Sequence, residues 1–173
     1  ENIIIRNCHF KGLHAVVIGS EMSAGVRNVI VEDCDYAGYC KRGIFIKTNP
    51  DRGGFVENLY VKNCCFDEVE DLFYVTSRYA GEGQDNHYFS TIRNIFIDGL
   101  KCNNVKQAAL VLQGTEVKPV FNVMFTNVDV AKAKIGLSFE NALDVNISSS
   151  HIGGKVGTPT TVTPQDNLFG KEK

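Results

Sequence analysis

The sequence predicts an all-β fold of the parallel β-helix type, with about six coils. Three observations predict it: a degenerate internal repeat, an alternation of apolar and polar side chains inside each copy, and a second apolar segment after each copy. Repeats of this length, rich in β-branched residues and variable in their loops, are typical of stacked β coils. We expect coils over residues 1–152 and an irregular strap or cap over residues 153–173.

Each copy of the repeat begins with Asn or Asp. The leading positions are Asn2, Asn28, Asn58, Asn94, Asn122 and Asp144. Residues one and three positions later are apolar in every copy, and the residue four positions later is polar. Because side chains alternate between the two faces of a strand, each copy is predicted to be a short strand with one buried face. Asn tolerates the left-handed backbone of a sharp turn, so the leading Asn residues are expected to stack as a hydrogen-bonded ladder.

A second apolar segment follows each leading residue by about sixteen positions. These segments lie at 16–18, 44–46, 73–75, 110–112 and 136–139. Each coil therefore supplies at least two short strands, and successive coils should stack at roughly 4.8 Å. The connecting loops that vary most are 48–54 and 79–91.

The cysteines follow the same repeat. Cys8, Cys34 and Cys64 each stand six positions after a leading Asn, so they are expected to stack inward as small apolar residues. The sequence holds no Cys-x-x-Cys pair, which argues against a zinc site, and stacked strands do not favour disulfide geometry. We expect buried free thiols, no metal and no cofactor.

The composition of the chain limits the classes of binding partner that it can have. The chain has 18 basic and 20 acidic residues and a net charge of −2, so no overall basic field attracts nucleic acid. No stretch approaches the roughly 20 apolar residues of a membrane span. The chain opens at Glu1 inside an expected strand, without Met or a signal peptide, so we expect that N-terminal coils of the same protein are missing.

One outer face collects residues suited to an anionic sugar chain. When the second apolar segments are aligned, His14, Arg42 and Asp71 share a column, and Phe45 and Lys47 point outward. Arg42, Lys47, Arg78 and Tyr79 then form a local basic patch with an aromatic ring, and cations of this kind bind carboxylates. On periodicity alone, an alternative remains open: these side chains are solvated residues of an outer face.

Two segments resemble glycoside hydrolase family 28, the polygalacturonases. Residues 14–20, His-Ala-Val-Val-Ile-Gly-Ser, are similar to a family segment in which a Gly-His-Gly precedes Ile-Gly-Ser. Residues 42–48, Arg-Gly-Ile-Phe-Ile-Lys-Thr, are similar to a family segment Gly-x-Arg-Ile-Lys-Thr. The resemblance is dense up to about residue 63. It implies a right-handed parallel β-helix and a secreted or periplasmic enzyme that hydrolyses pectin with inversion, which needs an acid and a base about 6.5–9.5 Å apart.

The resemblance also implies roles for single residues. His14 matches the family histidine that supports the catalytic acid. Lys47 matches the lysine that binds a galacturonate carboxylate, and Tyr79 matches a tyrosine that contacts the sugar. The family arginine two residues before this lysine is Phe45 here, which removes a carboxylate contact and would let an outward ring stack on a sugar. Arg42 and Arg78 are expected to complete the substrate-binding set.

The family draws its catalytic carboxylates from an Asn-Thr-Asp segment and an Asp-Asp pair, and neither occurs in this sequence. The resemblance therefore implies part of a pectin-active glycosidase, and this chain alone is expected to be inactive. Two alternatives stay open: a non-catalytic carbohydrate-binding β-helix, and a purely structural β-helix segment.

Overall fold

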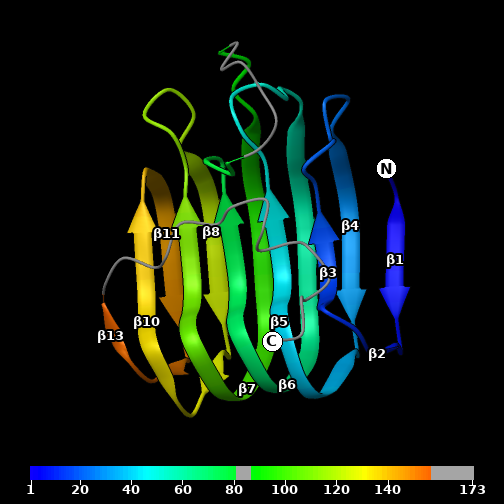
Figure 1. Ribbon diagram of the computed structural model, residues 1–173, viewed down its shortest axis with the longest axis vertical. Coiled ribbons are helices and arrows are strands. Elements are labelled where there is room, and N and C mark those ends of the chain that lie inside the picture. The colour runs from blue at the N-terminus through cyan, green and yellow to red at the C-terminus, as the bar shows by residue number, and fades with distance from the viewer. Residues whose placement is uncertain (81–86, 157–173) are drawn as a thin grey trace, which may run out of the picture.

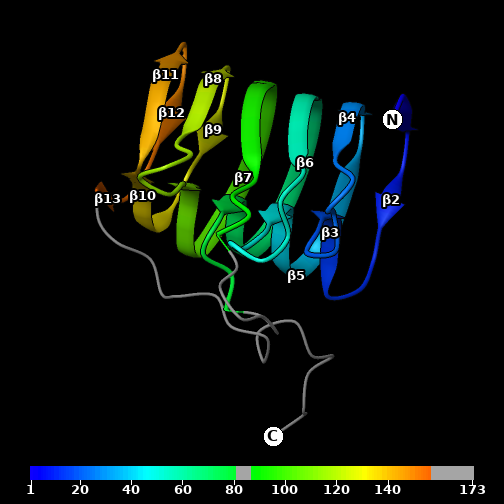
Figure 2. The same ribbon diagram turned by 90° about the horizontal axis from the view of Figure 1, so that it is seen from above.

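The chain folds into stacked coils of parallel β-strands, seen in a computed structural model that describes residues 1–80 and 87–156. The described residues form one 13-stranded sheet in which the strand pairs are parallel. The coils stack side by side from β1 at one end to β13 at the other (Figures 1 and 2). The predicted parallel β-helix is confirmed.

The stack of coils has three faces, each formed by one strand or strand segment from every coil that contributes to it. The first face is built from β1 (Ile3–Arg6), β4 (Val26–Glu32), the starts of β6 (Phe55–Thr76) and β7 (Thr91–Gln113), β8 (Val120–Thr126) and β11 (Ala142–Ser148). The second face is built from β2 (His9–Phe10), the start of β5 (Asp35–Lys47), the middles of β6 and β7, β9 (Asp129–Val130) and β12 (His151–Ile152). The third face is built from β3 (His14–Ile18), the ends of β5, β6 and β7, β10 (Ala133–Glu140) and β13 (Lys155–Val156).

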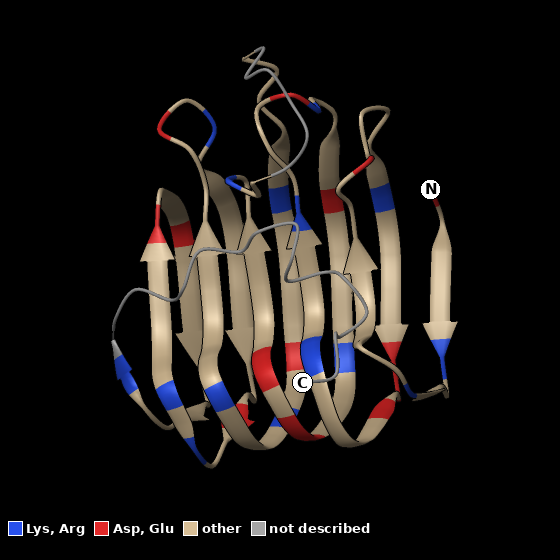
Figure 3. Ribbon diagram, in the orientation of Figure 1, with Lys and Arg blue, Asp and Glu red and all other residues tan. Residues whose placement is uncertain are grey.

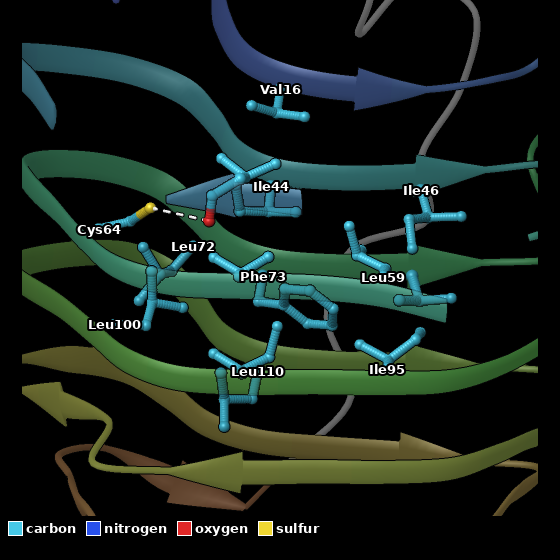
Figure 4. Close-up of a cluster of buried hydrophobic side chains, with 14 of the residues drawn as sticks. Val16, Ile44, Ile46, Leu59, Cys64, Leu72, Phe73, Ile95, Leu100 and Leu110 are labelled. Atoms are coloured by element: carbon cyan, nitrogen blue, oxygen red, sulfur yellow. Dashed lines mark hydrogen bonds between the residues drawn. The ribbon is translucent and has the colours of Figure 1, made fainter. Parts of the chain in front are cut away.

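The hydrophobic core fills the space between these faces. Residues of successive coils lie in register, as Ile44, Phe73 and Leu110 do on the third face. All three are at most 1% exposed, and the Phe73 ring packs edge-on against Phe125 with centroids 5.4 Å apart. Figure 4 shows these side chains converging from several coils. Burial of aliphatic and aromatic side chains of this size is the main stabilising contribution to such a fold.

The predicted Asn ladder is confirmed. Asn28 donates to the side-chain oxygen of Asn2 at 2.9 Å, and Asn58, Asn94 and Asn122 each donate in the same way to the Asn one coil before, at 2.9–3.0 Å. All five have a φ between 55° and 62°, the left-handed region that Asn tolerates best after Gly. Each ladder residue thus combines a turn with a bond between coils.

The cysteines are all free thiols, as expected. Cys34 and Cys64 are buried in the core and Cys8 is half-buried, so the predicted inward column is present, whereas Cys65 is exposed. Burial raises the pKa of the Cys64 thiol to about 12. A thiol of this kind is unreactive at neutral pH, and its role is packing.

The C-terminal boundary of the coils differs slightly from the expected one. Strand β13 pairs with β10 through Leu137 and Val156, so the sheet extends beyond residue 152. The rest of the expected strap, residues 157–173, and positions 81–86 of the expected variable loop lie outside the described residues. The described part of the chain contains no helix of the length and apolar character needed to cross a membrane.

Candidate active site

The six residues singled out by the sequence come from neighbouring strands of the third face. His14 begins β3, while Arg42, Phe45 and Lys47 belong to the end of β5. Arg78 and Tyr79 follow the end of β6 directly. The register pairs His14 with Arg42 and Arg42 with Asp71, so the predicted column is confirmed.

Phe45 is the centre of this group. Its ring centroid lies 6.1 Å from that of His14 and 5.8 Å from both Lys47 Nζ and Arg42 Cζ. Lys47 Nζ also lies 4.8 Å from the centroid of the Tyr79 ring. Five of the six predicted residues therefore meet around or beside one phenyl ring, and cations at these distances are attracted to its face.

The backbone brings β3 and β5 unusually close here. Gly19 has a φ of 105°, and a Cβ placed on it would collide with the backbone carbonyl oxygen of Lys47. Only glycine therefore fits at this position, because any side chain would push the end of β3 away from the lysine. This close approach explains why glycine stands at the middle of the Ile-Gly-Ser segment.

The structure corrects the expectation that the Phe45 ring is open to a sugar. Phe45 projects from the outer side of the sheet, since its neighbours Ile44 and Ile46 belong to the core, but it is only 1% exposed. It belongs to a second, smaller apolar cluster with Tyr74, Tyr79, Ala108 and Val111. A ring buried in this way packs against protein and offers no face for stacking.

Arg42 is not a solvated basic group either. Its side chain is 5% exposed, and Nη1 lies 2.9 Å from Asp71 Oδ2 and 3.2 Å from Glu70 Oε1. Asp71 also accepts a bond from the backbone N–H of Ala108 at 2.9 Å. The guanidinium charge is therefore balanced inside the protein, and its function is to hold β5 against β6 and β7.

Tyr79 is 9% exposed, and its backbone N–H donates to the carbonyl oxygen of Thr48 at 3.0 Å. Arg78 pairs with Glu140 instead, with Nη1 and Oε1 2.6 Å apart and both side chains more than 40% exposed. Of the predicted set, His14 and Lys47 are the residues that combine partial exposure with a place in the cluster.

The electrostatics of the cluster favour a neutral imidazole. Burial, followed by the positive charges of Arg42, Lys47 and Lys41, lowers the pKa of His14 to about 4, and Glu70 opposes this shift. Neither ring nitrogen of His14 has a hydrogen-bond partner in the described part of the protein. Burial also lowers the pKa of Lys47. Near neutral pH the His14 ring thus carries one N–H donor and one nitrogen acceptor, and both nitrogens are buried.

The structure adds two residues, Tyr74 and Gln113, to those selected from the sequence. Tyr74 lies in the same column as Phe45, its ring centroid is 5.7 Å from that of Phe45, and its hydroxyl donates to Gln113 Oε1 at 3.1 Å. The alignment of the second apolar segments already placed Tyr74 beside Phe45, which was the signal for it. Within the described ranges, no group of three or more His, Cys, Asp or Glu side chains could hold a metal ion.

The amino-acid sequence matches the model of a known family. The family model "Glycosyl hydrolases family 28" covers residues 1–150. The chain belongs to this family. It is 36% identical over 126 residues to a "Probable polygalacturonase" of Vitis vinifera, an alignment of 69% of this chain and 25% of the relative. It is 33% identical over 73 residues to a "Polygalacturonase" of Ralstonia solanacearum, which covers 40% of this chain and 14% of the relative.

This family-28 chain therefore spans about a quarter of the length of the grape relative that it matches. The family match agrees with the resemblance expected from residues 14–20 and 42–48. The cluster around Phe45 lies within the residues that the family model covers.

Proposed function

We propose that this chain forms the β-helical part of a pectin-degrading glycosidase that carries the sugar-binding residues of the active site, and that it acts outside the cytoplasm, as a secreted or periplasmic protein. Lys47 binds a galacturonate carboxylate, Tyr79 borders the sugar, and His14 supports the catalytic acid. The catalytic carboxylates, which act with inversion, belong to further coils of the same protein. Their absence leaves this chain alone without hydrolytic activity.

The observation that supports this proposal is the position of His14 at an open edge. Among the described strands, β3 pairs only with β5, and β1 pairs only with β4 (Figure 1). A further coil pairing with β3 would place its outward side chains roughly 4.8 Å from those of His14 and Val17. Both ring nitrogens of His14 are buried and lack a hydrogen-bond partner among the described residues, and we propose that a carboxyl group on that coil supplies one.

Apolar core residues are also exposed to solvent at this end of the stack, beside β1 and β3. Ile3 is 43% exposed, whereas its register partner Val29 is 3% exposed and the next residue in that column, Leu59, is fully buried. A cavity of about 260 Å³ lies here, lined by residues such as Ile5, Val16 and Met22. Apolar residues of a further coil would fill this cavity and remove the exposed column from water.

A non-catalytic sugar-binding role is the second candidate. It is favoured by the carboxylates that contact the cluster, Glu70 and Asp71, because both are paired with Arg42 and neither is placed as a free general acid or base. This role predicts the same ligand at Lys47 but no contribution of His14 to catalysis in any longer form of the protein.

Calorimetric titration with a galacturonate oligomer tests the proposal. We expect weak binding by the wild-type chain, a loss of about tenfold in affinity for Lys47→Met, and no change for Lys101→Met, an exposed lysine on the second face. Equal binding by Lys47→Met and wild type, or no binding by either, would overturn the assignment of this face.

A reducing-end assay on polygalacturonate separates the two candidates. The isolated chain should release no product, and release by this chain would contradict the need for carboxylates on other coils. In a longer form that carries the adjoining coils, His14→Gln should lower kcat strongly with little change in KM if the histidine supports the acid. An unchanged kcat would favour the non-catalytic role.

A further inference from the structure

The outer surface of the first face carries an exposed apolar stripe. It consists of one residue from each of five successive coils, in register: Ile4, Ile30, Tyr60, Phe96 and Met124. The residues on either side of Ile30, Tyr60, Phe96 and Met124 along their strands belong to the core, as does Ile5 beside Ile4, so the stripe itself points outward. Ile4 is 59% exposed, Tyr60 44% and Met124 43%. Contiguous apolar surface of this kind commonly marks an interaction site.

Two charged columns border the stripe. One contains Glu1, Arg27, Glu57 and Arg93, and the other contains Arg6, Glu32, Lys62 and Asp98. The sign of the charge alternates from coil to coil in each column, and within each coil the two columns carry opposite signs. Neighbours along a column form ion pairs, such as Arg27 with Glu1 at 2.5 Å and Arg93 with Glu57 at 3.0 Å. Basic and acidic bands accordingly alternate from strand to strand in Figure 3.

We propose that the first face binds a second copy of this chain, with the two sheets packed face to face about a two-fold axis parallel to the stack of coils. Under this rotation each coil lies over its own copy and the two charged columns exchange places. Glu57 then faces the partner's Lys62, and Arg93 faces the partner's Asp98. The same surface on both subunits is complementary to itself, as an isologous interface requires, and the apolar stripes meet between the charged borders.

The stripe has the shape of a sheet-packing surface and differs from a sugar-stacking platform. The rings of Tyr60 and Phe96 stack on each other, with centroids 5.2 Å apart and planes at 20°, so their faces point along the column. The two columns hold equal numbers of basic and acidic residues, which gives no net attraction for a polyanionic pectin chain. A hollow of about 320 Å³ beside Phe96 and Met124 can accept side chains of the partner.

The area of the surface predicts a weak dimer. Five strands about 4.8 Å apart, each contributing about six residues at 3.3 Å, cover a flat area of about 500 Å² per copy. This lies below the roughly 800 Å² per partner of a standard interface, so we expect a dissociation constant in the micromolar range. The inference is independent of the proposed activity, because it uses a different face of the β-helix.

Sedimentation equilibrium of the chain tests the dimer. The wild type should form a concentration-dependent dimer, Phe96→Glu and Met124→Glu should each raise the dissociation constant by about tenfold or more, and Val117→Glu in an exposed loop should leave it unchanged. Circular dichroism of each variant verifies that the coils remain folded, and Met124→Glu carries the test if Phe96→Glu does not fold.

Three results would overturn the proposal. The first is a wild-type chain that remains monomeric at concentrations of about 200 µM, well above the expected micromolar dissociation constant. The second is self-association that neither stripe variant weakens, which would place the contact elsewhere, for example at the open edge of β1. The third is a monomer whose retention on an insoluble neutral polysaccharide is lost in Phe96→Glu, which would make the stripe a sugar-binding surface.

Discussion

Arg42 and Asp71 form a buried ion pair between adjacent coils, with Nη1 and Oδ2 2.9 Å apart and side chains 5% and 4% exposed. We expect Asp71→Ala to lower the free energy of unfolding by about 3–5 kcal/mol, because it leaves the guanidinium buried beside a single, more distant carboxylate. Urea unfolding measures the effect. The matched control is Glu140→Ala, which breaks an exposed pair with Arg78 and should cost less than about 1 kcal/mol. Equal effects of the two substitutions would refute a special role for burial.

Phe45 separates three positively charged or protonatable side chains, Arg42, Lys47 and His14, and is itself buried. The resemblance to the family implies an arginine at this position, yet we expect Phe45→Arg to destabilise the fold by at least about 3 kcal/mol, because the new charge is buried without a partner. Phe45→Leu should cost much less, about 1–1.5 kcal/mol. Thermal unfolding of both variants would decide between them, and a Phe45→Arg protein as stable as Phe45→Leu would show that the cluster opens readily.

The depressed pKa of His14, about 4 in the folded protein, makes stability depend on pH. The unfolded chain, with an ordinary histidine pKa near 6.5, binds more protons than the folded protein between these two values. This contribution to stability is therefore complete above pH of about 6.5 and is lost as the pH falls toward 4. His14→Gln should be less sensitive to acid over this window in denaturant titrations at pH 7.5, 6 and 5. The same pH dependence in both proteins would argue against a buried neutral imidazole.

Asn58 joins three coils, since it donates to Asn28 at 2.9 Å and accepts from Asn94 at 3.0 Å, at a φ of 57°. We expect Asn58→Ala to cost about 2–3 kcal/mol through two lost hydrogen bonds and a strained backbone. Asn58→Gly should cost less, because glycine accepts the positive φ. Chemical denaturation of both, with the exposed strand position Asn146→Ala as a control, tests this order. A more stable Ala variant than Gly variant would contradict it.

The sequence was sufficient to predict the strands and the ladder, because the alternation of apolar and polar residues and the leading Asn both recur in successive coils. It did not reveal a second column of left-handed residues five positions later, formed by Asn7, Asp33, Asn63, Gly99, Asn127 and Ser149. That column was in principle visible from the fixed spacing. Its members vary among several residue types that can adopt a positive φ, so it lacks the uniform signal of the first ladder.

The site was predicted in position but not in accessibility. Alternation places Phe45 on the outer side of the sheet, and the structure agrees, but alternation carries no information about what covers that side. The pairing of Arg42 with Glu70 and Asp71 likewise depends on how a long side chain reaches across neighbouring coils. Residue types and register therefore indicated the members of the cluster, while burial shows that only His14 and Lys47 among them are partly exposed.

The stacking of coils makes this protein close to one-dimensional in its energetics, since each coil is stabilised mainly by the coils next to it. Unfolding therefore spreads from one coil to the next, and it begins at a terminal coil, which has only one neighbour. His14 belongs to such a terminal coil in the described structure, because β3 pairs with β5 alone. The exchange rate of the amide hydrogens of β3 is therefore governed by local opening of this coil, and a further strand paired with β3 would slow that exchange.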